Sequence, residues 1–248
     1  MKNITNMSGV TGPVRHSSTC PTKLAEQSRK SDGVKAKTGN KLSEVKLNYI
    51  RTYLHGDQLL DVGAGQCYYS SWIKKCYPHC AVYAIDHRLV APQEDITFIQ
   101  ADLEKTIAIE NEQFQTILAF DIIEHVANEE QLVSELYRLC KKDGILIGSV
   151  PHDDDKFLPA YNLTFYHRSD LTHKRYYIPE TLQASLERAG FTVMRIDKQG
   201  GVSPQVIAEF FPPSLRFMVK KTVGLLRRAK IVNSCVLSSD LFFVAKKA

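Results

Sequence analysis

The sequence predicts an α/β protein with a doubly wound, mainly parallel sheet covered by helices on both faces. Two observations support this fold class. From residue 42 onward, short apolar runs alternate with segments whose apolar residues recur at helical spacing. The first apolar run leads into a glycine turn, Gly63-Ala64-Gly65, and a helical pattern follows at once. Strand, tight turn and helix in this order are typical of parallel sheets, which are buried on both faces.

The first elements surround this glycine turn. Val45, Tyr49 and Tyr53 lie at helical spacing and predict an amphipathic helix that leads into a strand at 58–62. A second helix is expected directly after the turn, at 68–76. Glycines suit the turn because a side chain there would keep the backbone away from a ligand.

Three further strands each end at an aspartate or directly before one. They are expected at 81–86, 96–102 and 115–120. The carboxyl ends of parallel strands lie at one edge of the sheet, where α/β proteins bind their ligands. Asp86, Asp102 and Asp121 should therefore converge with the glycine turn on one crevice.

The next helix is recognised by its two ends. Asn128–Gln131 resembles a capping box at its start. Lys141 and Lys142 suit the negative end of the helix, and Gly144 suits its stop. A fifth strand is expected at 145–150.

Turn residues also mark the C-terminal elements. Pro179 is expected to open a helix that Gly190 ends. Apolar runs at 191–197 and 240–247 then predict a sixth and a seventh strand.

Composition indicates one large domain with a full core. The chain has 248 residues, of which 44% are hydrophobic and 24% charged, as in soluble globular proteins. No apolar run approaches the ~18–20 residues of a membrane span. Residues 1–40 lack apolar periodicity and predict a flexible basic N-terminal arm before a domain at 41–248. Because the arm is poor in acids, a targeting segment also stays open as an interpretation.

The charges are unevenly distributed along the chain. Residues 1–41 hold 8 Lys/Arg and 2 Asp/Glu, and residues 216–248 hold 8 and 1. Residues 42–215 hold 16 Lys/Arg and 24 Asp/Glu, so the centre of the chain is acidic. Enzymes that act on nucleic acid more often carry a basic stripe across the folded face. We therefore expect no nucleic-acid partner.

Cysteine spacing predicts neither a zinc site nor a disulfide framework. The six cysteines lack paired CxxC spacings, and the chain is too long for a disulfide miniprotein. Cys76, His79 and Cys80 are close in sequence, but Pro78 favours a helix end there over a metal site. We expect no metal and a reducing, cytoplasmic location.

The glycine turn excludes one common cofactor. A nicotinamide dinucleotide site requires GxGxxG, and its third glycine position is occupied by Tyr68. Asp86 lies 21 residues after Gly65, where a carboxylate can accept hydrogen bonds from ribose hydroxyls. An adenosine-containing ligand without a pyrophosphate fits both observations.

These segments together resemble the class I S-adenosylmethionine-dependent methyltransferases, in the small-molecule branch that includes quinone-biosynthesis and natural-product enzymes. The resemblance covers residues 42–198 and the last strand. It rests on the segments LLDVGAG, AID, QADL, IIEHV, KKDGILIGSVP and THKRYYIPETLQASLERAGF. It implies a Rossmann-like sheet of seven strands whose last strand is antiparallel. Cys67 departs from the family pattern, which frequently has a third glycine at this position.

The resemblance also implies a cofactor, S-adenosyl-L-methionine, and residues that bind it. Asp61, Gly63 and Gly65 would flank its methionine part, and Asp86 would hold the ribose. The adenine would lie against Asp102 and Leu103, and the sulfonium above Phe120 and Asp121.

Two long connections are expected at the same edge of the sheet, at 151–178 and 199–239. The first is rich in Tyr and His, which suits a lid over a partly aromatic acceptor. Its candidate acceptor-binding residues are Tyr161, Tyr166, His167 and Tyr176. Two candidate catalytic bases are His125, just after the fourth strand, and His173 in the lid.

Within the second connection, residues 216–230 hold six basic residues and no acid. Phe217, Met218, Val223 and Leu226 give this segment an apolar face, which suits peripheral contact with an anionic membrane. A helical cap docked on the domain with solvated lysines is the alternative.

The sequence thus predicts an enzyme that methylates a small-molecule acceptor, at oxygen. The alternatives are a methyltransferase of protein or nucleic acid and a non-catalytic protein that binds S-adenosylmethionine.

Overall fold

The computed structural model describes residues 42–89, 95–153, 168, 170–200, 207–208, 211–228 and 238–248. The expected N-terminal arm lies outside these residues. So do Tyr161, Tyr166, His167 and parts of both long connections.

Seven strands and five α-helices form the described part of the chain. The strands are β1 Gln58–Val62, β2 Ala81–Asp86, β3 Ile96–Gln100, β4 Phe114–Phe120, β5 Cys140–Pro151, β6 Phe191–Gln199 and β7 Asp240–Lys247. The helices are α2 Glu44–Tyr53, α3 Tyr68–Cys76, α4 Glu129–Leu139, α5 Pro179–Arg188 and α7 Pro213–Arg228, with a 3₁₀ turn, η1, at Ile123–His125.

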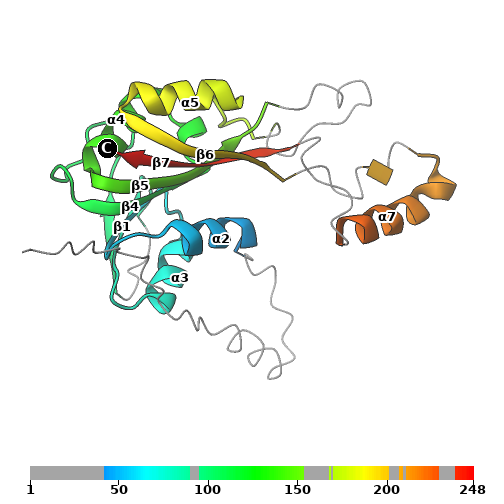
Figure 1. The fold of residues 1–248 in the computed structure, drawn as a ribbon, viewed down its shortest axis with the longest axis horizontal. Coiled ribbons are helices and arrows are strands. Elements are labelled where there is room, and N and C mark those ends of the chain that lie inside the picture. Colours follow the sequence, from blue (N-terminus) through cyan, green and yellow to red (C-terminus); the bar gives the residue numbers. More distant parts are fainter. Residues whose placement is uncertain are drawn as a thin grey trace, which may run out of the picture. The chain divides into compact units, whose positions relative to one another are not determined.

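The strands form one sheet in the order β3-β2-β1-β4-β5-β7-β6 (Figure 1). The first five strands in this order form four parallel pairs, and β7 pairs antiparallel with both β5 and β6. The predicted Rossmann-like, seven-stranded sheet with an antiparallel last strand is therefore confirmed. The order reverses between β1 and β4, which is the switch point where such sheets bind ligands.

Helices cover both faces of the sheet, as Figure 1 shows. The apolar residues of α4 and α5, among them Leu132, Leu136 and Leu182, share a core with one face of the strands. Tyr49 and Ile50 of α2 and Ile73 of α3 pack against the other face. Strands that are buried on both sides need the near-continuous apolar runs from which the sheet was predicted.

Two predicted boundaries are wrong. β3 ends at Gln100, so Asp102 follows the strand and does not close it. β5 begins at Cys140, so Lys141, Lys142 and Gly144 lie in the strand and do not end α4. Pairing with β4 explains the second error, since Phe114 pairs with Cys140 and the register then shifts.

Among the described helices, none is long and apolar enough to cross a membrane. The basic segment at 216–230 does form a helix over most of its length, within α7.

Candidate cofactor and active site

The glycine turn between β1 and α3 adopts left-handed backbone angles at both glycines. Gly63 has φ 70°, and a Cβ there would lie 2.7 Å from the Ile122 side chain. Gly65 has φ 54°, and a Cβ there would meet no atom within 4 Å. The first glycine is thus required by packing, whereas the second faces open space that a ligand can occupy.

Asp86 is fixed beside this turn at the end of β2. The Gly65 N–H donates to its Oδ2 at 2.8 Å, and the Arg88 N–H donates to its Oδ1 at 3.0 Å. Two backbone donors hold the carboxylate in place and leave lone pairs on both oxygens. This geometry suits an acceptor for two ribose hydroxyls.

Asp61, near the end of β1, is buried under the turn. The Ser70 hydroxyl on α3 donates to its Oδ2 at 2.5 Å. Burial raises the pKa of Asp61 to about 6, although the Ser70 hydrogen bond and the Lys46 charge oppose the shift. A carboxylate in this position can attract the positive ammonium group of a methionine moiety.

Cys67 is the N-cap residue of α3 and has φ 57°, in the left-handed region. Glycine occupies this region without strain, which gives a physical reason why a glycine is frequent at this position. The Cys67 side chain is fully buried, and burial raises the pKa of its thiol to about 11. The cysteine is therefore a packed, unreactive group and not a nucleophile.

The two adenine-binding candidates follow β3, next to Asp86 along the sheet edge. Ala101 donates its N–H to the Asp86 carbonyl at 3.1 Å, which fixes this neighbourhood. Asp102 is exposed and accepts the Glu104 N–H, and Lys105 Nζ lies 3.0 Å from its Oδ2. Leu103 is buried within the core on the α4 side of the sheet.

Phe120 ends β4 at the switch point, Asp121 follows it, and a lysine from α2 reaches both residues. Lys46 Nζ lies 2.5 Å from Asp121 Oδ2 and 5.2 Å from the centroid of the Phe120 ring. The Tyr69 ring centroid is 5.6 Å from the same ammonium group. Ser149 donates to Asp121 Oδ1 at 2.5 Å. Two rings and a carboxylate thus form a site that favours positive charge.

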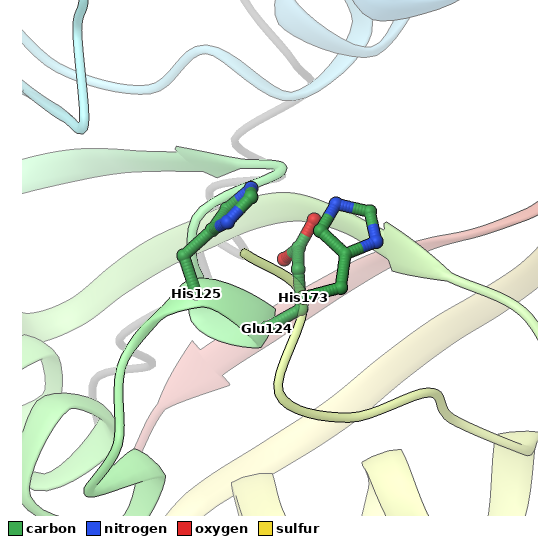
Figure 2. A group of neighbouring side chains, drawn as sticks. All are labelled: Glu124, His125 and His173. Atoms are coloured by element: carbon green, nitrogen blue, oxygen red, sulfur yellow. The ribbon is translucent and has the colours of Figure 1, made fainter. Parts of the chain in front are cut away.

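Glu124, His125 and His173 form a cluster next to Asp121. One ligand atom of each lies within 4.8 Å of the other two. Figure 2 shows the Glu124 carboxylate between the two imidazole rings, whose centroids are 4.6 Å apart. Burial raises the pKa of Glu124 to about 8, and the Asp121 charge adds to the shift. Sequence analysis missed Glu124, although it belongs to the same segment as His125.

Thr172 determines which nitrogen of His125 carries the proton. Its hydroxyl lies 2.6 Å from Asp170 Oδ1 and must donate there, because the carboxylate has no hydrogen to give. Thr172 Oγ1 also lies 2.8 Å from His125 Nδ1, so it accepts the Nδ1–H. The lone pair of a neutral His125 is therefore on Nε2.

Backbone hydrogen bonds hold the segment that carries His173. Lys174 donates its N–H to the Glu124 carbonyl at 2.9 Å, and Tyr177 donates to the Pro151 carbonyl at 3.0 Å. Tyr176 lies beside the cluster, with its ring centroid 5.9 Å from that of His173. The structure thus brings together His125, His173 and Tyr176, which come from two separate segments.

A model of the methyltransferase-domain family matches residues 25–196. The chain belongs to this family. It is a class I S-adenosylmethionine-dependent methyltransferase, as the sequence predicted, and S-adenosylmethionine is its cofactor. A search of curated proteins found no match.

Solved structures share the fold of this methyltransferase. A structure described as a putative methyltransferase from Bacillus halodurans is 18% identical, with a TM-score of 0.56 over 83% of this chain and 99% of that chain. The Burkholderia thailandensis 1,6-didemethyltoxoflavin-N1-methyltransferase is 14% identical, with a TM-score of 0.53 over 83% of this chain and 77% of that chain. A Haloferax volcanii putative methyltransferase, in complex with the activator Trm112, is 13% identical, with a TM-score of 0.57 over 82% and 88%.

Proposed function

We propose that this enzyme transfers the methyl group of S-adenosylmethionine to a hydroxyl oxygen of a small molecule. In the reaction an oxygen lone pair forms the new C–O bond while the C–S bond breaks. The bonding electrons pass to sulfur, which becomes a neutral thioether, and the hydroxyl proton must leave. The products are a methyl ether and S-adenosylhomocysteine. The cofactor supplies the activated carbon, so the protein has to align the acceptor and remove its proton.

The observation that carries the oxygen assignment is the cluster next to Asp121. A hydroxyl is a poor nucleophile until it loses its proton, so an O-methyltransferase needs a group that promotes this loss. His125 Nε2 has an available lone pair, and His173 lies beside it. Direct proton removal typically gives ~10²–10⁴-fold in rate.

The cofactor pocket in this proposal uses the turn and its neighbours. Asp61, Gly63 and Gly65 contact the methionine part, and Asp86 accepts the ribose hydroxyls. The remaining assignments are Asp102 and Leu103 for the adenine and Phe120 and Asp121 for the sulfonium. The open space at Gly65 and the two fixed oxygens of Asp86 support the pocket.

A small acceptor is favoured over an anionic polymer by charge. The residues from 42 to 215 carry more acids than bases, which disfavours the binding of nucleic acid to this part of the chain. The Burkholderia enzyme is named for a small-molecule substrate that is methylated at nitrogen. A nitrogen acceptor is therefore the second candidate.

Labelling with methyl-tritiated cofactor tests both proposals. The purified chain is incubated separately with the low-mass and the macromolecular fraction of a cell extract, and labelled products are identified by mass spectrometry. We expect a labelled methyl ether in the low-mass fraction. Label confined to protein or nucleic acid would overturn the small-molecule assignment, and a labelled amine would overturn the oxygen assignment.

Histidine variants then test the cluster. His125→Ala and His173→Ala should each lower kcat by at least about tenfold at saturating cofactor. His55→Ala removes an exposed histidine outside the site and should leave kcat unchanged. If neither cluster variant loses activity, the cluster has no part in proton removal.

A further inference from the structure

The cluster of Glu124, His125 and His173 has the composition of a metal site. Two imidazoles and one carboxylate are borderline ligands that suit divalent first-row transition ions. Among the described residues, no other group of three or more His, Cys, Asp and Glu side chains brings its ligand atoms together in this way. The three side chains enter from two elements and point to a common position (Figure 2).

A second observation independently indicates a missing positive partner. Glu124 is 1% exposed, and its Oε2 has no hydrogen-bond partner among the described residues. An unpaired buried carboxylate oxygen is costly, because it loses its hydration and gains nothing in return. The Glu124 side chain points toward the two imidazoles, and the Lys174 N–H holds η1 by donating a hydrogen bond to the Glu124 carbonyl.

We propose that Glu124, His125 and His173 bind one divalent transition metal ion through the Glu124 carboxylate and one nitrogen of each imidazole. This differs from the expectation of no metal drawn from sequence. That expectation followed cysteine spacing, whereas these ligands are histidine and glutamate from distant segments.

The distances need little adjustment for such an ion. Ligand atoms about 2.0–2.2 Å from one ion lie roughly 3–4 Å from each other. The observed upper limit of 4.8 Å requires only small side-chain rotations. Three protein ligands leave further coordination positions open, as in catalytic sites rather than structural ones.

Thr172 and Asp170 supply an outer shell of the kind that metal-binding histidines use. Thr172 accepts the Nδ1–H of His125 and donates to Asp170. This hydrogen bond fixes the ring orientation and presents the Nε2 lone pair. The chain Asp170–Thr172–His125 therefore fits an imidazole that is a ligand as well as it fits a base.

Metal binding itself does not depend on the proposed function, but the role of the ion in the reaction does. An ion at the cluster would place positive charge beside the acceptor oxygen and lower the pKa of its hydroxyl. The proton could then leave to solvent, and the histidines would act as ligands rather than as direct bases.

Metal binding is tested without any acceptor, so its outcome is independent of the proposed function. The full-length chain, without a histidine tag, is stripped with EDTA and titrated with Co²⁺, whose visible absorption reports nitrogen ligands. Equilibrium dialysis against Zn²⁺, Mn²⁺ or Mg²⁺ with elemental analysis gives the stoichiometry. We expect one ion per chain and tighter binding of Zn²⁺ or Mn²⁺ than of Mg²⁺.

Three variants separate the site from incidental binding. Glu124→Gln and His173→Ala should each weaken Co²⁺ binding by at least about tenfold. His55→Ala is the matched control and should bind as the wild type does. S-adenosylhomocysteine binding by each variant shows that its fold is intact. A wild-type chain that gives no Co²⁺ absorption band overturns the proposal, as does equal binding by the cluster variants and the control.

Discussion

Lys46 Nζ lies 2.5 Å from Asp121 Oδ2, although the two residues are 75 positions apart in the sequence. The pair joins α2 to the end of β4, and the ammonium group lies over the rings of Tyr69 and Phe120. In the proposed pocket the sulfonium lies above Phe120 and Asp121. The lysine therefore shares one carboxylate with the positive charge of the cofactor.

The shared carboxylate should determine how strongly the enzyme prefers S-adenosylmethionine over the product S-adenosylhomocysteine. S-adenosylmethionine carries a sulfonium charge and S-adenosylhomocysteine does not, so Lys46 repels only the former. Lys46→Met should raise the affinity for S-adenosylmethionine relative to that for S-adenosylhomocysteine by about three- to tenfold. Asp121→Asn should lower this affinity ratio by a similar factor. Titration calorimetry with both ligands measures the ratio.

Lys46→Arg is the control for this prediction, because it keeps the charge. Its affinity ratio should stay close to that of the wild type. A ratio that is the same in Lys46→Met and the wild type would show that the ammonium group does not reach the sulfonium.

Cys67 predicts an unusual order of stability among its variants. Its left-handed φ of 57° costs a residue other than glycine roughly 1–2 kcal/mol, whereas its buried sulfur contributes packing. In Cys67→Gly the two changes nearly cancel, so its free energy of unfolding should stay within about 1 kcal/mol of the wild type. Cys67→Val adds a β-branched side chain in a region it avoids and should lose about 2 kcal/mol or more. Urea unfolding measures both, and equal stabilities would contradict the argument.

Two strands with chemically marked ends could be predicted to the residue. β1 is bounded by the glycine turn, β2 by Asp86, and both match their predicted limits. The start of β5 could not be found in this way. Lys141–Gly144 is polar and looks like a helix end, yet Cys140 and Ile145 on either side of it pair with β4, so the segment lies in β5 as an irregularity, with Asp143 at φ 62°. Tertiary pairing here overrides a local pattern.

The residues of the candidate site also fall into those that a local sequence signal predicts and those that only the folded chain brings together. Gly63, Gly65 and Asp86 could be predicted because one turn and one neighbouring strand bring them together. Lys46 and Thr172 had no signal, since each is an ordinary polar residue that only the folded chain places at the site. Glu124 was hidden because a single acid beside two isoleucines looks like the solvated side of a helix.

Asp61 predicts how stability depends on pH. Burial raises its pKa from 3.8 to about 6, so the folded state binds the proton more tightly than the unfolded chain. The resulting stability is present below pH 3.8 and is lost as the pH rises through about 6. Asp61→Asn removes this loss. As the pH rises from 4 to 7, the free energy of unfolding of Asp61→Asn should increase by about 1–3 kcal/mol relative to that of the wild type.

Urea unfolding across this pH range measures the difference for Asp61. Ser70→Ala is a control that should change the pH dependence of stability in the opposite direction from Asp61→Asn, because it removes the hydroxyl that stabilises the charged form of Asp61. The loss of stability with rising pH should be larger in Ser70→Ala than in the wild type. Parallel curves for wild type and Asp61→Asn would show that the carboxyl is not desolvated in the folded chain.

Thr172 should act as a positioning residue for His125. Thr172→Val keeps the shape but removes the hydrogen bond to Nδ1, so the ring and its proton are no longer fixed. We expect kcat to fall by about tenfold while the affinity for S-adenosylmethionine is unchanged. Thr172→Ser retains the hydroxyl and should restore most of the activity. Equal losses in the Val and Ser variants would indicate a packing role instead.

α7 carries a basic and an apolar surface that suit an anionic membrane. Phe217, Met218 and Leu225 are more than half exposed, and Lys220 and Lys221 lie on the same helix. Basic residues near an anionic bilayer contribute about 1 kcal/mol each, so Lys220→Glu with Lys221→Glu should weaken vesicle binding by tenfold or more. Co-sedimentation with phosphatidylserine-containing vesicles measures this, and Lys75→Glu with Lys142→Glu is the matched control. If the wild type binds neutral and anionic vesicles equally, the lysines are simply solvated and α7 is not a membrane contact.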